Sequence, residues 1–125
     1  MTEASRSLHE AAEALRPETA DRHRAIASLM EELEAVDWYQ QRVDAAGDDE
    51  LRAVLAHNRD EEIEHAAMVL EWLRRHDPTF AKMLRAYLFT VADITRIEKT
   101  GEGRADDPSL DDSLGIGDLK GDEPL

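Results

Sequence analysis

The residues best suited to chemistry are a glutamate and a histidine three positions apart. A helix places Glu62 and His65 on one face, where a carboxylate oxygen and an imidazole nitrogen can bind the same metal ion. Glu-x-x-His is part of the ligand set of two-metal carboxylate sites, which take one Glu from each of two helices and Glu-x-x-His from each of two others. Of the five histidines, only His65 has a glutamate three residues before it. The chain therefore carries half of such a site.

A second glutamate lies at the same predicted height. If two helices fold back on each other about Gly47, then Glu32 and Glu62 are each fifteen residues, or about 22 Å, from the turn. Two inward carboxylates at one level repel each other unless a cation or a proton is shared between them. No lysine or arginine lies between positions 26 and 36 to compensate them. The spacing predicts a metal site of Glu32, Glu62 and His65 that a two-fold symmetric dimer completes.

Four neighbours of Glu32 have two interpretations on the residues alone. Glu31, Glu34 and Trp38 form a column on another face of the helix, which is either ordinary helix surface or a funnel for incoming cations. Trp38 and Tyr39 are either packing and dimer contacts or residues that support the site. Tyr39 lies two turns beyond Glu32, near enough to orient a metal ligand.

The elements that must position these residues are all helices. The sequence predicts an all-α protein: an antiparallel helical hairpin (residues 18–46 and 49–75) followed by a shorter third helix over residues 78–97. Asp77-Pro78 separates the second helix from the third. The second helix has a predicted core-facing stripe, with polar residues at its centre: Leu51, Leu55, Asn58, Glu62, His65, Val69 and Trp72. Dimerisation of two hairpins would complete a four-helix bundle.

Glycine and charge divide the chain into three segments. Residues 1–16 are an N-terminal arm, with a short helix expected over residues 7–16; residues 17–97 are the helical domain. Residues 98–125 contain five of the six glycines, and from Gly101 onward eight acidic residues face two basic ones, which is typical of a flexible tail.

Composition narrows the range of partners. The 125 residues include 15 basic and 29 acidic ones, a net charge of −14, so binding to nucleic acid or to an anionic membrane is disfavoured and cations are favoured. Cysteine is absent, and the longest apolar run, residues 66–70, is too short to cross a bilayer. We expect a single-domain, soluble, intracellular protein.

Three stretches resemble the encapsulated ferritins, a truncated branch of the ferritin-like superfamily: residues 22–26, 30–39 and 56–68. Residues 112–121 are similar to the loading peptide that docks cargo inside encapsulin shells. Leu114, Ile116 and Leu119, separated by glycines on an acidic tether, suit an extended peptide that binds an apolar groove.

The resemblance implies a fold and an activity. It implies a half-ferritin whose dimers form a ring-shaped decamer, with Glu32, Glu62 and His65 from two chains binding two iron ions at the dimer interface. Glu31 and Glu34 would receive incoming iron, and Trp38 and Tyr39 would line the site. The implied activity is a ferroxidase that oxidises Fe(II) with dioxygen, in the cytoplasm, inside an encapsulin nanocompartment that holds the mineral. Peroxide as the oxidant, and a non-catalytic helical scaffold recruited to a shell, are the alternatives.

Overall fold

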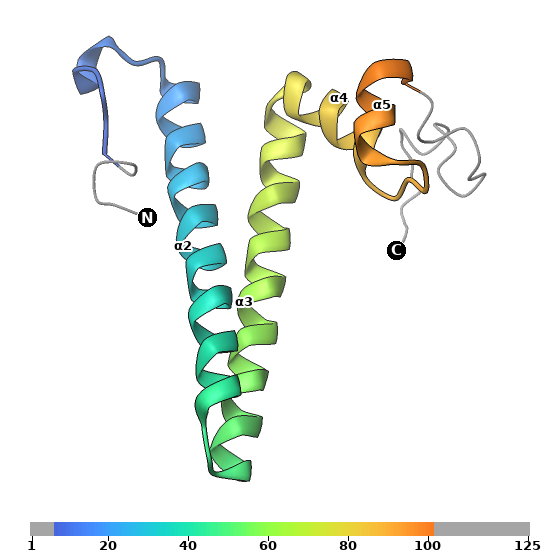
Figure 1. Cartoon of the computed structure of the whole chain (residues 1–125). Helices are drawn as coiled ribbons and strands as arrows, with labels where there is room; N and C mark the ends of the chain where they lie inside the picture. Colours follow the sequence, from blue (N-terminus) through green and yellow to red (C-terminus); the bar gives the residue numbers. More distant parts are fainter. Residues whose placement is uncertain (1–6, 102–125) are drawn as a thin grey trace. The chain divides into compact units, whose positions relative to one another are not determined.

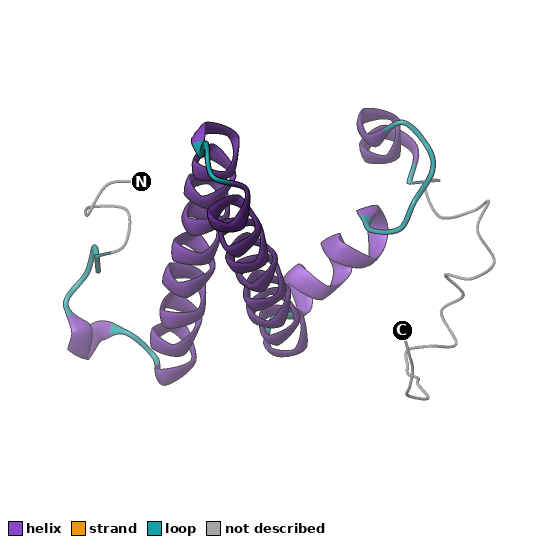
Figure 2. Cartoon of the chain, turned by 90° about the horizontal axis from the view of Figure 1, so that it is seen from below, coloured by secondary structure: helices purple, strands orange, loops and turns teal. Residues whose placement is uncertain are grey.

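The computed structural model describes residues 7–101, and every regular element within this range is helical (Figure 2). In chain order these are a short 3-10 helix η1 (Ala12–Ala14) and the helices α2 (Pro17–Ala45), α3 (Asp49–His76), α4 (Pro78–Tyr87) and α5 (Ile94–Thr100). These elements fall into two compact units, divided between His76 and Asp77. The predicted all-α class is confirmed.

Helices α2 and α3 form the predicted antiparallel hairpin, closest together near the turn and wider apart at its open end (Figure 1). Pro17 begins α2, where its missing N–H has no helical partner to lose. After Ala45 the chain turns through Gly47. The Asp48 carboxylate then accepts a hydrogen bond of 2.8 Å from the backbone N–H of Leu51 and so caps the start of α3. The turn therefore lies at Gly47, as the sequence predicted.

The predicted core-facing stripe of α3 is exposed at its end nearer the turn. Leu51, which the prediction placed in the core, is 49% exposed. The stripe residues Leu55, Asn58, Glu62, Val69 and Trp72 are partly buried. Ala66 and Leu73, the buried residues of α3, each follow a stripe residue by one position, so the less exposed face includes the predicted stripe and extends about 100° beyond it.

The N-terminal arm is less helical than predicted. A helix was expected over residues 7–16, but the structure has a single 3-10 turn, Ala12–Ala14. Leu15 and Arg16 are extended, with ψ of 141° and 152°. A proline disfavours the α conformation in the residue before it, so Pro17 prevents a helix in the arm from continuing into α2.

The predicted third helix is two helices. The Asp77 carboxylate caps α4 by accepting the backbone N–H groups of Thr79 and Phe80, at 2.9 and 3.1 Å. The chain leaves the helix after Tyr87, Phe89 adopts a φ of 60°, and the Thr90 hydroxyl donates to the Tyr87 carbonyl. A positive φ cannot be continued as a right-handed helix, so α5 begins anew and runs to Thr100, three residues beyond the predicted end.

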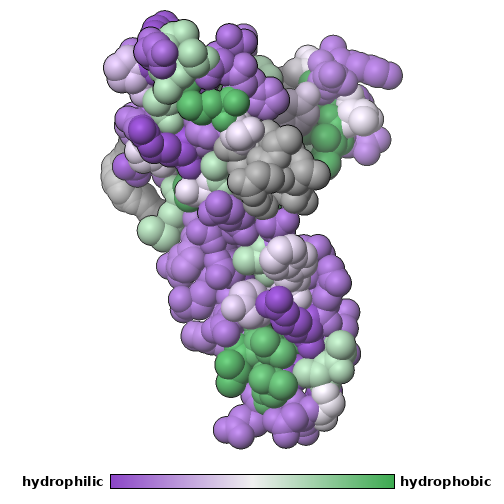
Figure 3. All heavy atoms as spheres, turned by 90° about the vertical axis from the view of Figure 1, so that its left-hand side faces the viewer, coloured by the Kyte–Doolittle hydropathy of each residue, from purple (hydrophilic) through white to green (hydrophobic). Residues whose placement is uncertain are grey.

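The surface of the hairpin combines charge with isolated apolar side chains. Most of the face drawn in Figure 3 is hydrophilic. Several large apolar residues of α2 and α3 are nevertheless about half exposed or more: Leu33, Trp38, Leu51, Val54, Ile63 and Met68. Within residues 7–101, no helix is both long and apolar enough to cross a lipid bilayer. The hairpin thus leaves apolar side chains uncovered by its own residues.

Candidate metal centre

Glu32 of α2 meets Glu62 and His65 of α3 in the middle of the hairpin. Each residue offers one ligand atom, and the three atoms lie within 4.8 Å of one another. His65 Nδ1 is 3.4 Å from Glu62 Oε1 and 3.7 Å from Glu32 Oε1. Glu62 and His65 reach this point from one face of α3 because they are three residues apart, and Glu32 reaches it because the turn at Gly47 sets both glutamates at one height.

The proximity of Glu62 changes the ionisation of Glu32. A hydrogen bond from Glu62, followed by partial burial and charge repulsion from Glu62, raises the pKa of Glu32; the nearby His65 opposes this shift. The side chains of Glu32 and Glu62 are only 26% and 24% exposed, whereas that of His65 is 45% exposed. A pair of close, half-buried carboxylates holds either a proton or a cation between them.

The donor set suits a transition-metal ion. Carboxylate oxygens are hard ligands and imidazole is an intermediate one, a combination found in carboxylate-rich iron and manganese sites and also compatible with zinc. Three donors from one chain do not complete the coordination of even one iron ion, and they do not hold two. The exposed position of His65 leaves one side of the group open to further ligands.

A hydrogen bond between Arg59 of α3 and Gln40 of α2 was not predicted from the sequence. Arg59 precedes Glu62 by three residues, yet its guanidinium Nη1 donates to Gln40 Oε1 of α2 at 2.7 Å. The polar character of the two residues was the only indication of this pairing in the sequence, because a long arginine side chain has many possible partners.

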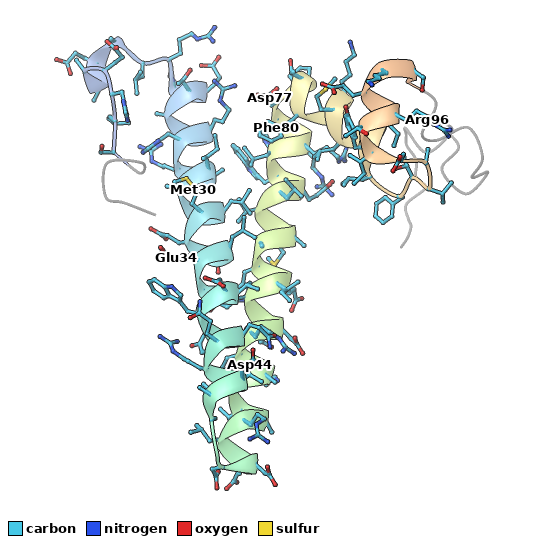
Figure 4. The ribbon with its side chains drawn as sticks, in the orientation of Figure 1. Met30, Glu34, Asp44, Asp77, Phe80 and Arg96 are labelled. Atoms are coloured by element: carbon cyan, nitrogen blue, oxygen red, sulfur yellow. The ribbon has the colours of Figure 1, made fainter. Side chains whose placement is uncertain are left out.

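The other four predicted residues lie outside this group within one chain. Glu31 is exposed, and Glu34 lies on the side of α2 away from α3 (Figure 4). Trp38 is 49% exposed and lines a shallow pocket with Gln41, Arg42 and Ala45. The Tyr39 ring lies 5.2 Å from the Arg42 guanidinium, a cation–π distance within α2. Among the described residues, the group whose ligand atoms lie within 4.8 Å of one another consists of Glu32, Glu62 and His65.

Comparison with known proteins identifies similar chains. The pattern of the EncFtn-like family matches residues 7–91. The encapsulated ferritin-like protein of Rhodospirillum rubrum is 59% identical, over 100% of this chain and 96% of its own length. The ferritin-like protein of Thermotoga maritima is 50% identical, over 86% of this chain and 93% of its own length.

Two further matches concern a shorter region and a solved structure. The encapsulin nanocompartment cargo protein EncC of Myxococcus xanthus is 43% identical over 47 residues, which are 38% of this chain and 36% of that protein. The crystal structure of protein ne0167 from Nitrosomonas europaea is 62% identical, with a TM-score of 0.68, over 70% of this chain and 97% of that chain.

Proposed function

The chain belongs to the EncFtn-like family, and from this premise we propose that it is a ferroxidase. It oxidises Fe(II) to Fe(III) with dioxygen at a di-iron site shared between two copies of the chain. The observation that carries this proposal is the convergence of Glu32, Glu62 and His65, whose ligand atoms lie within 4.8 Å of one another. Iron is both the substrate and the metal that these side chains bind.

The second copy follows from the number of ligands. One chain offers two carboxylates and one imidazole, whereas a two-metal site in a helical bundle takes four carboxylates and two imidazoles. A two-fold axis beside His65 doubles the set. The partly exposed His65 and the uncovered apolar residues of the hairpin, among them Leu33 and Met68, support burial against a second hairpin.

Each of the predicted residues has its own role in binding or oxidising iron. Each Fe(II) gives up one electron, and dioxygen accepts the pair. Glu32 and Glu62 stabilise the higher charge of Fe(III), and His65 completes the ligand set. In the dimer, Glu31 and Glu34 attract incoming Fe(II), while Trp38 and Tyr39 line the site. The net charge of −14 raises the local concentration of the cation around the protein.

The assembly and its location form part of the same proposal. Dimers associate into a ring-shaped decamer, which is iron-storage cargo of an encapsulin nanocompartment in the cytoplasm. The name of the Rhodospirillum rubrum relative, an encapsulated ferritin-like protein, and that of the Myxococcus xanthus cargo protein support this role. The shell protein is therefore the expected partner.

Native mass spectrometry combined with an oxygen-consumption assay tests the ferroxidase proposal. Anaerobic addition of Fe(II) should give even-numbered assemblies carrying two iron ions per pair of chains, and admission of dioxygen should produce Fe(III) with matching oxygen uptake. The alternative, a non-catalytic helical scaffold, predicts the same assemblies with and without iron and no turnover. Absence of bound iron together with absence of oxygen uptake would establish the scaffold instead.

Deletion of residues 113–121 tests recruitment to a shell separately from chemistry. This segment lies outside the described residues 7–101, and its resemblance to a loading peptide predicts that the deletion abolishes co-purification with a co-expressed encapsulin shell protein. Iron oxidation should stay within about twofold of the full chain, because the metal-binding group is more than 40 residues away in sequence. Encapsulation that persists after the deletion would contradict the prediction.

A further inference from the structure

One turn before Glu62, α3 carries an arginine whose guanidinium binds other side chains. Arg59 is three residues before Glu62, a spacing at which side chains on one helix meet, and its side chain is only 25% exposed. A guanidinium is a strong partner for carboxylates because it can donate two parallel hydrogen bonds to them. Yet the partners of the Arg59 guanidinium are Gln40 and Asp60, and not either of these two glutamates.

Gln40 accounts for the direction of the guanidinium. Arg59 Nη1 donates to Gln40 Oε1 at 2.7 Å across the hairpin, which draws the guanidinium toward the turn and away from Glu62. The Gln40 amide is itself fixed, because its Nε2 donates to Asp44 Oδ1 at 2.9 Å one turn further along α2. Figure 4 shows Asp44 in the part of the hairpin nearer the turn.

A second anchor of Arg59 lies on its own helix. Its Nε and Nη2 lie 3.0 and 2.9 Å from Asp60 Oδ1, and the Asp60 side chain is 65% exposed. Asp60 is adjacent to Arg59 in sequence, so it does not tie the arginine to the other helix. Of these contacts, the bond to Gln40 is the one that crosses to α2.

We propose that Gln40 is a positioning residue that holds Arg59 away from Glu32 and Glu62, which keeps both carboxylates available to Fe(II). The inference rests on the proposed function, since it assigns a role in supplying that site with free ligands. A neutral amide suits this task because it accepts a hydrogen bond from the guanidinium without adding another carboxylate that would bind metal. Without Gln40, the guanidinium is free to pair with Glu62 and compete with the metal.

Anaerobic titration calorimetry with Fe(II) on the full-length chain tests the proposal. Gln40→Ala should weaken Fe(II) binding about tenfold, because one charge-assisted hydrogen bond to a carboxylate must now be broken. The double variant Gln40→Ala/Arg59→Met should return to within about twofold of the wild type, since methionine retains an apolar stem but has no charge. A purely structural role of Gln40 predicts no such rescue.

The controls separate the outcomes. Gln41→Ala removes the next amide, which donates to Asp37 within α2 at 3.1 Å, and should leave Fe(II) affinity within about twofold of the wild type. Gln40→Met, which keeps the side-chain length but not the acceptor, should behave as Gln40→Ala and covers the case in which that variant folds poorly. Wild-type affinity in both Gln40 variants, or a double variant as weak as Gln40→Ala, would overturn the proposal. A wild-type chain that binds no Fe(II) overturns the proposed function instead.

Discussion

Replacement of Glu62 by alanine is expected to lower the initial rate of Fe(II) oxidation by about 100-fold or more. Glu62 contacts both other members of the group: its Oε1 lies 3.4 Å from His65 Nδ1, and its carboxylate shares a hydrogen bond with Glu32. Changes to groups that merely support a metal ligand cost roughly 10- to 100-fold in affinity or activity, so loss of a ligand itself should cost at least as much. In a two-fold dimer the substitution also removes two carboxylates at once.

The matched control for this variant is Glu64→Ala. Glu64 belongs to the same helix, is exposed, and carries the same charge, so its removal changes helix propensity and net charge as Glu62→Ala does. It should keep wild-type activity to within about twofold. Stopped-flow absorbance of Fe(III) formation, at equal protein concentration and with circular dichroism to verify helix content, gives the comparison. Equal rates in Glu62→Ala and the wild type would remove Glu62 from the proposed site.

The hairpin and the meeting of Glu32 with Glu62 were accessible from sequence because they depend on few quantities. A regular helix advances a fixed distance per residue, and one glycine turn fixes which positions of α2 and α3 share a height. Two glutamates equally far from Gly47 must then come to the same level, whatever the surrounding side chains do. Element boundaries at Pro17 and Asp77 followed from local capping chemistry in the same way.

Other features of the structure depend on backbone conformations and side-chain pairings that a single sequence does not indicate. The break between α4 and α5 arises from the positive φ of Phe89, a conformation that a bulky residue rarely adopts and that no neighbouring glycine announces. The pairing of Arg59 with Gln40 was one of many that a long side chain could make. The roles proposed for Glu31, Trp38 and Tyr39 require a second copy of the chain, so the geometry of one hairpin does not test them.

Glu32→Gln is expected to have two opposite effects, a gain in the stability of the metal-free protein and a loss of Fe(II) binding. In the folded chain the pKa of Glu32 is raised above its ordinary value by the hydrogen bond with Glu62, by partial burial and by charge repulsion from Glu62. A carboxyl group whose pKa is raised by folding makes the folded state less stable as pH rises through that pKa, because the folded state then loses a proton it holds more tightly than the unfolded chain does. At pH 7 the wild type therefore carries an electrostatic penalty that glutamine, which has the same shape and no charge, removes.

The size of the gain follows from the strength of like-charge repulsion between neighbouring side chains. About 0.5 kcal/mol is expected, equivalent to a rise of about 2–4 °C in the midpoint of thermal unfolding for a domain of this size. The difference should vanish at about pH 3 and below, more than one unit under the ordinary pKa of a glutamate, because Glu32 is then protonated in both the folded and the unfolded chain. Calorimetric unfolding in the presence of a chelator, at pH 7 and at about pH 3 and at one protein concentration, measures both values.

The loss of metal binding should be much larger than the gain in stability. A neutral amide does not offset the charge of a divalent ion, so Fe(II) affinity should fall at least tenfold, which is about 1.4 kcal/mol per site. The control is Glu64→Gln, which replaces an exposed glutamate of α3. It should change the unfolding midpoint by no more than about 1 °C and the Fe(II) affinity by no more than about twofold. A metal-free Glu32→Gln protein that unfolds at a lower temperature than the wild type at pH 7 would show that the carboxylate stabilises the hairpin on its own. A higher unfolding temperature for Glu32→Gln would show that repulsion between the two carboxylates destabilises the metal-free protein. Binding of Fe(II) then relieves this repulsion.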